Sequence, residues 1–167
     1  MKITIGKLRT LIREAMITSL EPNMKVIIDH DGRNLNINIL EAGKPKAHGP
    51  GFILLQRIQV EGGTIWEVVN SGAKKGIGPL LYDISMEYVV GRIGDLGITP
   101  DTSMVSGEAQ GIWDFYLNQR PDVESEPLPE NFIHVADRPE SLRNYYYKIG
   151  TPTLDKLEGE NLIEYRT

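Results

Sequence analysis

The chain has 167 residues, a formal net charge of −5 at pH 7 and no cysteine. This length suits one compact domain, and the acidic balance argues against a general nucleic-acid-binding protein. Without cysteine there is no disulfide, no thiol nucleophile and no thiolate metal site. No apolar run reaches membrane-spanning length and no secretion signal opens the chain, so we expect a soluble protein of intracellular origin.

Residues 1–20 are predicted to form an amphipathic helix, which Glu21-Pro22-Asn23 ends. One face is basic, and the other carries apolar residues at helical spacing, namely Ile5, Leu8, Leu11, Ile12, Ala15 and Met16. Two interpretations remain open: a first helix packed on the domain, or an arm that binds a partner or an acidic surface.

Residues 24–70 predict a meander of antiparallel strands. Lys25–His30 and Leu35–Leu40 flank Asp31-Gly32, a dipeptide typical of tight hairpins. Phe52–Val60 and Thr64–Asn70 flank a second glycine-containing turn. Side chains alternate between the two faces of a strand. We therefore expect one face of the last strand to carry Ile65, Glu67 and Val69. The other face is expected to carry Trp66, Val68 and Asn70.

The remainder is predicted to be mostly helical. Pro79–Ile93 is apolar nearly all round, which indicates a buried helix with Asp83 and Glu87 as its narrow polar strip. Ser106 is the expected N-cap of a second helix, Gly107–Gln119. The other expected segments are a poor strand at Gly94–Ser103, a surface connection at Asp122–Asn131, a last strand at Phe132–Ala136, a helix from Asp137 to Lys148, and a short helical turn from Thr151-Pro152.

These elements predict a single α+β domain built on a mostly antiparallel sheet of about four to five strands flanked by helices. We divide it into the N-terminal helix or arm (1–20), a core (24–136) and a C-terminal helical segment (137–167). No repeat or second-domain boundary is visible.

The stretch from Gly72 to Pro79 connects the last predicted strand to the buried helix. Its glycines let backbone N–H groups approach a ligand, and a helix N-terminus carries partial positive charge, so the stretch predicts an anion-binding cradle. Lys74 and Lys75 add formal positive charge. The alternative interpretation is an ordinary tight connection with two solvated lysines.

The sequence lacks the residues that hydrolase, metal, dinucleotide and Walker-type phosphate sites require. There is no Gly-x-Ser-x-Gly elbow, and His30, His48 and His134 do not have metal-ligand spacing, so we expect no metal site. Leu81 replaces the third glycine of a dinucleotide fingerprint, and Gly78-Pro79 cannot close a phosphate-binding loop of the Walker type.

Hairpins that lead through a glycine turn into a helix resemble the GNAT-type N-acetyltransferases, over residues 24–119. In that family the turn Arg/Gln-x-x-Gly-x-Gly/Ala holds the pyrophosphate of acetyl-coenzyme A. The segment Ala73–Gly78 matches both glycine positions, with alanine in place of the leading Arg or Gln. The resemblance implies a cofactor site on the strand and turn, made by Val68, Val69, Lys74, Lys75, Gly76, Ile77 and Gly78.

The resemblance also implies two catalytic residues. Glu67 matches a general base for the acceptor amine, and Tyr116 matches the acid that protonates the departing thiolate. The alternatives are a polar residue on a half-exposed strand for Glu67 and a core residue for Tyr116. If Gly94–Ser103 forms no strand, the V-shaped opening that seats the cofactor is either absent or built from Phe132–Ala136.

The opening Met-Lys-Ile-Thr and the stretch Gly76–Glu87 resemble small proteins of tailed bacteriophages. Two functions follow. One is a phage-encoded acetyltransferase acting on a small-molecule or peptide amine in the host cytoplasm. The other is a non-catalytic head or neck subunit of the virion that docks on other subunits through its N-terminal helix and Tyr145-Tyr146-Tyr147. The alternative interpretation of the tyrosine cluster is a partly buried helix face. Neither implies direct contact with nucleic acid or membrane, and a homo-oligomer is compatible with both.

Overall fold

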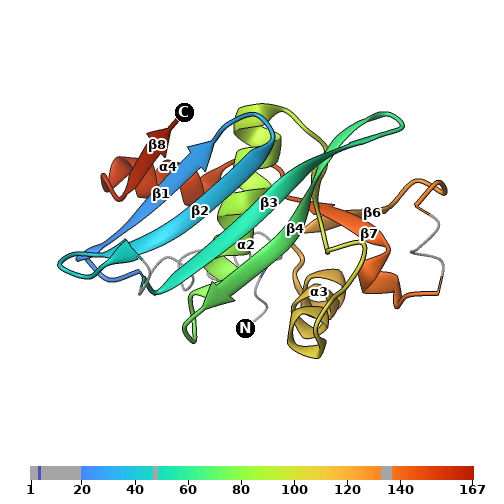
Figure 1. Cartoon of the computed structure of the whole chain (residues 1–167), viewed down its shortest axis with the longest axis horizontal. Coiled ribbons are helices and arrows are strands. Elements are labelled where there is room, and N and C mark those ends of the chain that lie inside the picture. Colours follow the sequence, from blue (N-terminus) through green and yellow to red (C-terminus); the bar gives the residue numbers. More distant parts are fainter. Residues whose placement is uncertain (1–3, 5–19, 47–48, 133–136) are drawn as a thin grey trace.

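Eight strands form one mixed sheet in the computed structural model, which describes residues 4, 20–46, 49–132 and 137–167 (Figure 1). Across the sheet their order is β6-β7-β5-β4-β3-β2-β1-β8. In chain order they are β1 (Met24–His30), β2 (Asn34–Glu41), β3 (Gly51–Val60), β4 (Gly63–Ala73), β5 (Gly97–Thr99), β6 (Glu124–Pro127), β7 (Asn144–Tyr147) and β8 (Ile163–Arg166). The mixed class agrees with expectation, but the expected count of about four to five strands was too low.

The two predicted hairpins, β1–β2 and β3–β4, are confirmed. In the first turn a carboxylate oxygen of Asp31 accepts hydrogen bonds from the backbone N–H groups of Arg33, at 2.8 Å, and Asn34, at 2.7 Å. Gly32 takes a φ of +87°, which a residue with a side chain rarely adopts. Local turn chemistry therefore sets the register of the β1–β2 hairpin.

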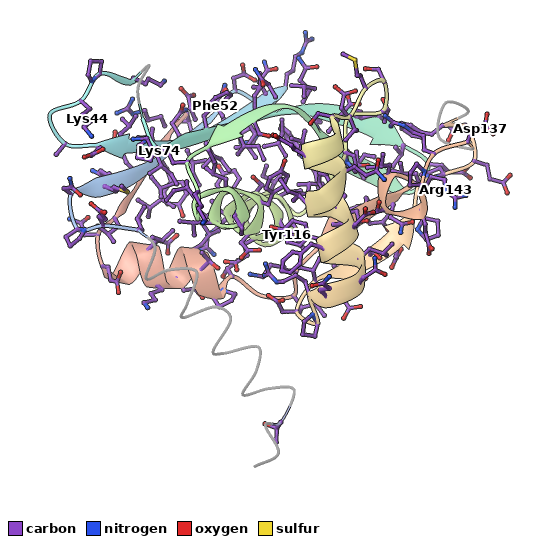
Figure 2. All side chains as sticks on the ribbon, turned by 90° about the horizontal axis from the view of Figure 1, so that it is seen from below. Lys44, Phe52, Lys74, Tyr116, Asp137 and Arg143 are labelled. Carbon is purple, nitrogen blue, oxygen red and sulfur yellow. The ribbon has the colours of Figure 1, made fainter. Side chains whose placement is uncertain are left out.

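Three α-helices lie on one face of the sheet: α2 (Gly78–Tyr88), α3 (Gly107–Gln119) and α4 (Pro152–Gly159). Figure 2 shows them beneath the sheet, and none of the described helices covers the other face. The last turn of α2 continues as a π-helical segment, η2 (Val89–Ile93). None of the described helices is long and apolar enough to cross a membrane.

The buried helix is confirmed as the centre of the core. Leu80, Leu81, Ile84 and Met86 of α2 are at most 1% exposed, and they pack in one cluster with the inward residues of β1, β2 and β3. The predicted N-cap is also confirmed, because the Ser106 hydroxyl accepts a hydrogen bond from the Ala109 N–H of α3.

The expectation of a poor strand at Gly94–Ser103 was wrong. Its central residues form β5, which runs parallel to β4 with Ile65 opposite Gly97 and Glu67 opposite Thr99. A Cβ atom on Gly97 would lie 2.4 Å from the Tyr146 carbonyl oxygen of β7. Only glycine fits between these strands, so the residue that indicated a loop is the one that permits the strand.

The C-terminal third is less helical than predicted. The expected helix Asp137–Lys148 was wrong, because a short 3₁₀ turn, η4 (Glu140–Leu142), is followed by β7. The surface connection Asp122–Asn131 contains β6, and β8 was not expected at all. The helical turn after Thr151 is confirmed as α4. Phe132 is in no strand, and the rest of the expected strand Phe132–Ala136 lies outside the described residues, as does the predicted helix 1–20 apart from Thr4 and Leu20.

Candidate functional site

Strands β4 and β5 separate after three paired residues. Their parallel pairing ends at Glu67 and Thr99, whereas β4 continues to Ala73 with β3 on its other edge. Beyond Glu67, among the described residues, the edge of β4 that faced β5 has no strand partner. Backbone N–H and C=O groups of such an edge are open to another ligand.

A β-bulge lies at the point of separation. Leu54 of β3 pairs with Asn70 and Leu55 with Val68, so Val69 is an extra residue on β4. The bulge shifts the alternation of side chains, because residues directly opposite each other share a face. Asn70 therefore lies on the uncovered face with Leu54, and the expectation that it shares a face with Trp66 and Val68 was wrong.

Two adjoining hollows follow this edge of β4. The larger, of about 320 Å³, lies between the end of β4, the glycine turn and the first turns of α2 and α3. The smaller, of about 170 Å³, extends it along Val68, Val69 and Asn70 towards Trp113. They share four lining residues, Ser71, Tyr82, Ser106 and Ala109. We call the two hollows together the β4 cleft.

The glycine turn forms one end of the β4 cleft. Gly76 has a φ of +88° and open space where a Cβ atom would lie. No side chain caps the first turn of α2, and that turn contains no acidic residue, so its partial positive charge meets the hollow. Lys74 and Lys75 are exposed and line the same hollow. This arrangement suits an anionic ligand.

Of the seven expected cofactor residues, Ile77 differs from the rest. Its side chain is 4% exposed and belongs to the hydrophobic core. Its N–H donates to the Lys74 carbonyl oxygen at 3.0 Å and so closes the turn. Val68, Val69, Lys74, Lys75, Gly76 and Gly78 all line the β4 cleft.

Glu67 lies at the junction where the two strands part. It is half-buried, and one carboxylate oxygen accepts hydrogen bonds from the backbone N–H and, at 2.6 Å, from the hydroxyl of Thr102. Its opposite residue on β3 is Gln56, on the face that α2 does not cover. Thr102 therefore holds the carboxylate in place on the opposite face of β4 from Val68, and Glu67 is absent from the residues that line the β4 cleft.

Tyr116 lies in the interior, between α3 and α2 (Figure 2). It is 2% exposed, and its hydroxyl donates to the Pro79 carbonyl oxygen at 3.3 Å. The guanidinium of Arg120 lies 5.3 Å from the centre of its ring. Burial, and next the negative charge of Asp83, raise the pKa of Tyr116 well above its ordinary value. It is absent from the residues that line the β4 cleft.

Tyr82 of α2 lines both hollows of the cleft, and the sequence analysis missed it. Its hydroxyl lies 3.2 Å from the Ser71 hydroxyl of β4. Burial raises the pKa of Tyr82, while the hydrogen bond with Ser71 acts in the opposite direction. The available signal was a tyrosine one helical turn after the glycine turn, hidden among the apolar residues of the buried helix.

Five charged residues form a buried network behind α2, which the sequence analysis also missed. Its members are Asp83 and Glu87 of α2, Arg120 and Asp122 after α3, and Lys148 after β7, all at most 7% exposed. The Lys148 ammonium lies 2.7 Å from a Glu87 oxygen, and Arg120 contacts both Asp83, at 3.0 Å, and Asp122, at 2.7 Å. The other Glu87 oxygen accepts from the N–H groups of Thr153 and Leu154, which begin α4.

Across the described ranges no group of three or more histidine, aspartate or glutamate residues is arranged to hold a metal ion. Comparisons with protein-family models, with curated proteins and with solved structures find no match for this chain.

Proposed function

We propose that the chain is a phage-encoded acetyltransferase-like protein that binds acetyl-coenzyme A in the β4 cleft and transfers the acetyl group to an amine. The observation that carries the proposal is the separation of β4 from β5 beyond Glu67, with a bulge at Val69 and a glycine turn at the end of the opened edge. The GNAT-type enzymes that the sequence resembles seat their cofactor in such a V-shaped opening.

The cofactor would lie along the opened edge. Its pyrophosphate meets the first turn of α2, Lys74 and Lys75, where positive charge gathers. Its pantetheine arm follows β4, whose free backbone groups pair with the amides of the arm as another strand would. The thioester then lies near Val69, at the end of the opened edge that is farther from the glycine turn and next to Glu67 along β4.

The chemistry needs a base, a carbonyl-polarising group and an acid. Glu67, whose side chain lies outside the lining of the cleft, takes a proton from the amine through water, and the amine nitrogen then attacks the thioester carbonyl. Backbone N–H groups near Val69 stabilise the oxyanion. When the carbon–sulfur bond breaks, a tyrosine protonates the thiolate. We assign this step to Tyr82, because it lines the cleft and Tyr116 does not.

One residue favours a second candidate function. Ala73 stands where the family turn carries Arg or Gln, so one phosphate-binding side chain is missing. A virion subunit that keeps the fold without the activity would show such a loss. The two candidates differ in whether the cleft binds the cofactor.

Thermal unfolding with and without acetyl-coenzyme A tests this difference. Ligand at a hundred times its dissociation constant stabilises a folded protein by about 2.7 kcal/mol. For a chain of this length that corresponds to a rise of roughly 5–10 °C in the unfolding temperature. The absence of any rise at millimolar ligand would leave the virion subunit as the better proposal.

A matched pair of variants locates the site. Gly76 and Gly94 both have a φ of +88° and open space at the Cβ position. Gly76→Asp and Gly94→Asp therefore add the same charge and similar backbone strain, but only the first faces the cleft. We expect Gly76→Asp to abolish the thermal shift and Gly94→Asp to retain it. Equal shifts in both variants would show that the turn does not hold the phosphates.

A further inference from the structure

A separate hollow, of about 700 Å³, lies at the same end of the sheet as the glycine turn. Residues of β2, β3, β4 and the loop before β3 line it, among them Asn38, Lys46, Phe52, Gly72, Ala73 and Lys74. The last three also line the β4 cleft, so the two hollows meet around the end of β4. We call this one the Phe52 hollow.

Phe52 presents an aromatic ring on the uncovered face of the sheet. A side chain at its neighbour Gly51 would point at Ile77 and Leu81 of α2, so Phe52 points away from the helices. A Cβ atom on the opposite residue, Gly72, would lie 2.9 Å from the Phe52 ring. The ring therefore rests against bare backbone and remains 39% exposed. An exposed ring beside open space is a platform on which a nucleobase can stack.

The surroundings of this ring are positively charged. Lys44, Lys46, Lys74 and Lys75 lie in the segments that border the Phe52 hollow and the adjoining end of the β4 cleft. Glu41 is the acidic residue on the Phe52 side, and Glu108 lines the β4 cleft. Glu41 is paired with Lys44 at 2.7 Å. Within the described part of the chain Lys46 and Lys74 take part in no ion pair, and both are exposed. Figure 2 shows Lys44, Lys74 and Phe52 at one end of the molecule. In a chain of net charge −5 this end is suited to an anion.

We infer that the Phe52 hollow binds the phosphorylated adenosine end of the coenzyme, with the adenine against Phe52 and the 3′-phosphate near Lys46 and Lys74. The inference rests on the proposed function, because the pyrophosphate at the glycine turn is what brings the adenosine to Lys74. The lysines on this side also take over the role of the missing Arg or Gln at position 73.

Calorimetric titration of the whole chain with acetyl-coenzyme A, and with the same thioester lacking the 3′-phosphate, tests the inference. We expect Phe52→Ala to weaken binding of both ligands at least about fivefold, since stacking on an aromatic side chain contributes appreciably to base binding. Lys46→Gln should weaken only the ligand that carries the 3′-phosphate, and less so at high salt.

Two control variants match these changes. Phe115 of α3 is also 39% exposed and lies outside both hollows, so Phe115→Ala removes an equal aromatic surface elsewhere. Lys156→Gln removes a charge on α4, which lies on the face of the sheet opposite to Phe52 (Figure 2). Both should leave the affinity unchanged. Unfolding temperatures measured without ligand show whether each variant folds. If Phe52→Ala does not fold, Lys46→Gln still tests the inference, because Lys46 is exposed and its substitution leaves the core intact.

The outcomes separate this inference from the proposed function. The inference would be overturned if the affinity for acetyl-coenzyme A is high but does not change with Phe52→Ala, with Lys46→Gln or on removal of the 3′-phosphate. The proposed function would then still stand. Failure of the wild-type chain to bind either ligand would overturn both.

Discussion

Two tyrosines illustrate how neighbouring residues of one type take different roles. Tyr82 and Tyr116 are both nearly buried, and their ring centres lie 5.9 Å apart. The Tyr116 hydroxyl is used inside the fold, on the Pro79 carbonyl, whereas the Tyr82 hydroxyl reaches Ser71 at the wall of the β4 cleft. Access to the cleft, not helix position, distinguishes the candidate acid from a core residue.

The pair Tyr82→Phe and Tyr116→Phe tests this distinction. We expect Tyr82→Phe to lower turnover about a hundredfold, in the range of general acid catalysis, and to leave cofactor binding intact. Tyr116→Phe should keep turnover and lose about 0.5–1.5 kcal/mol of stability, the contribution of one hydrogen bond. Release of coenzyme thiol with a panel of amines measures the activity, and the chain adds no background because it has no cysteine. A loss of turnover in Tyr116→Phe alone would return the role to Tyr116.

At the scale of elements, α2 connects the glycine turn to the C-terminal part of the chain. Its two acidic residues face inward because Arg120, Lys148 and the first N–H groups of α4 satisfy them. A second link to α4 is exposed: Arg92 of η2 pairs with Asp155 at 3.2 Å and with Glu158 at 3.0 Å. Both links hold α2 or its π-helical extension to the C-terminal part of the chain, but only the first is buried.

We therefore expect very different costs when each link is cut. Lys148→Met leaves buried carboxylates without their cation and should lower the free energy of unfolding by about 3–5 kcal/mol. Arg92→Met should cost less than about 1 kcal/mol, as is usual for exposed ion pairs. Urea unfolding measures both. Adding Glu87→Gln to Lys148→Met should recover part of the loss, and a double variant no more stable than Lys148→Met would argue against a charge effect.

At the scale of the whole molecule, the buried network makes stability depend on pH. It holds three carboxylates and two cations, so one carboxylate is in excess. Burial raises the pKa of Asp83 to about 6, although Lys148 and Arg120 act in the opposite direction. The Arg120 guanidinium holds the pKa of Asp122 below its ordinary value despite its burial. We therefore expect Asp83 to be the carboxylate of this network that binds a proton on folding.

The sign of the effect follows from linkage. Because the folded pKa of Asp83 lies above the unfolded value, its stabilising contribution is complete below about pH 4 and is lost as the pH rises to about 6. We expect the stability of the wild type relative to Asp83→Asn to fall by about 1–3 kcal/mol across that window. Urea unfolding at several pH values gives both curves. Parallel curves would mean that Asp83 does not take up the proton.

The sequence alone determined the elements whose signals are local. Asp31-Gly32 specified the first hairpin, the Ser106 hydroxyl specified the start of α3, and the apolar surface of Pro79–Ile93 specified a buried helix. Each depends on contacts within a few residues or on the period of a single element. The glycine turn was recognisable for the same reason.

Only the tertiary structure decided the rest, because it depends on residues far apart in the chain. Gly97 is compatible with a strand because the Tyr146 carbonyl packs against it and leaves no room for a side chain. Tyr145, Tyr146 and Tyr147 form a strand because β5 and β6 pair with them on either side. The opening between β4 and β5, the bulge at Val69 and the choice between Tyr82 and Tyr116 all follow from that non-local pairing. The sequence contains the residues of the cleft, but the cleft itself forms because β4 pairs with the distant strand β5 and that pairing ends at Glu67.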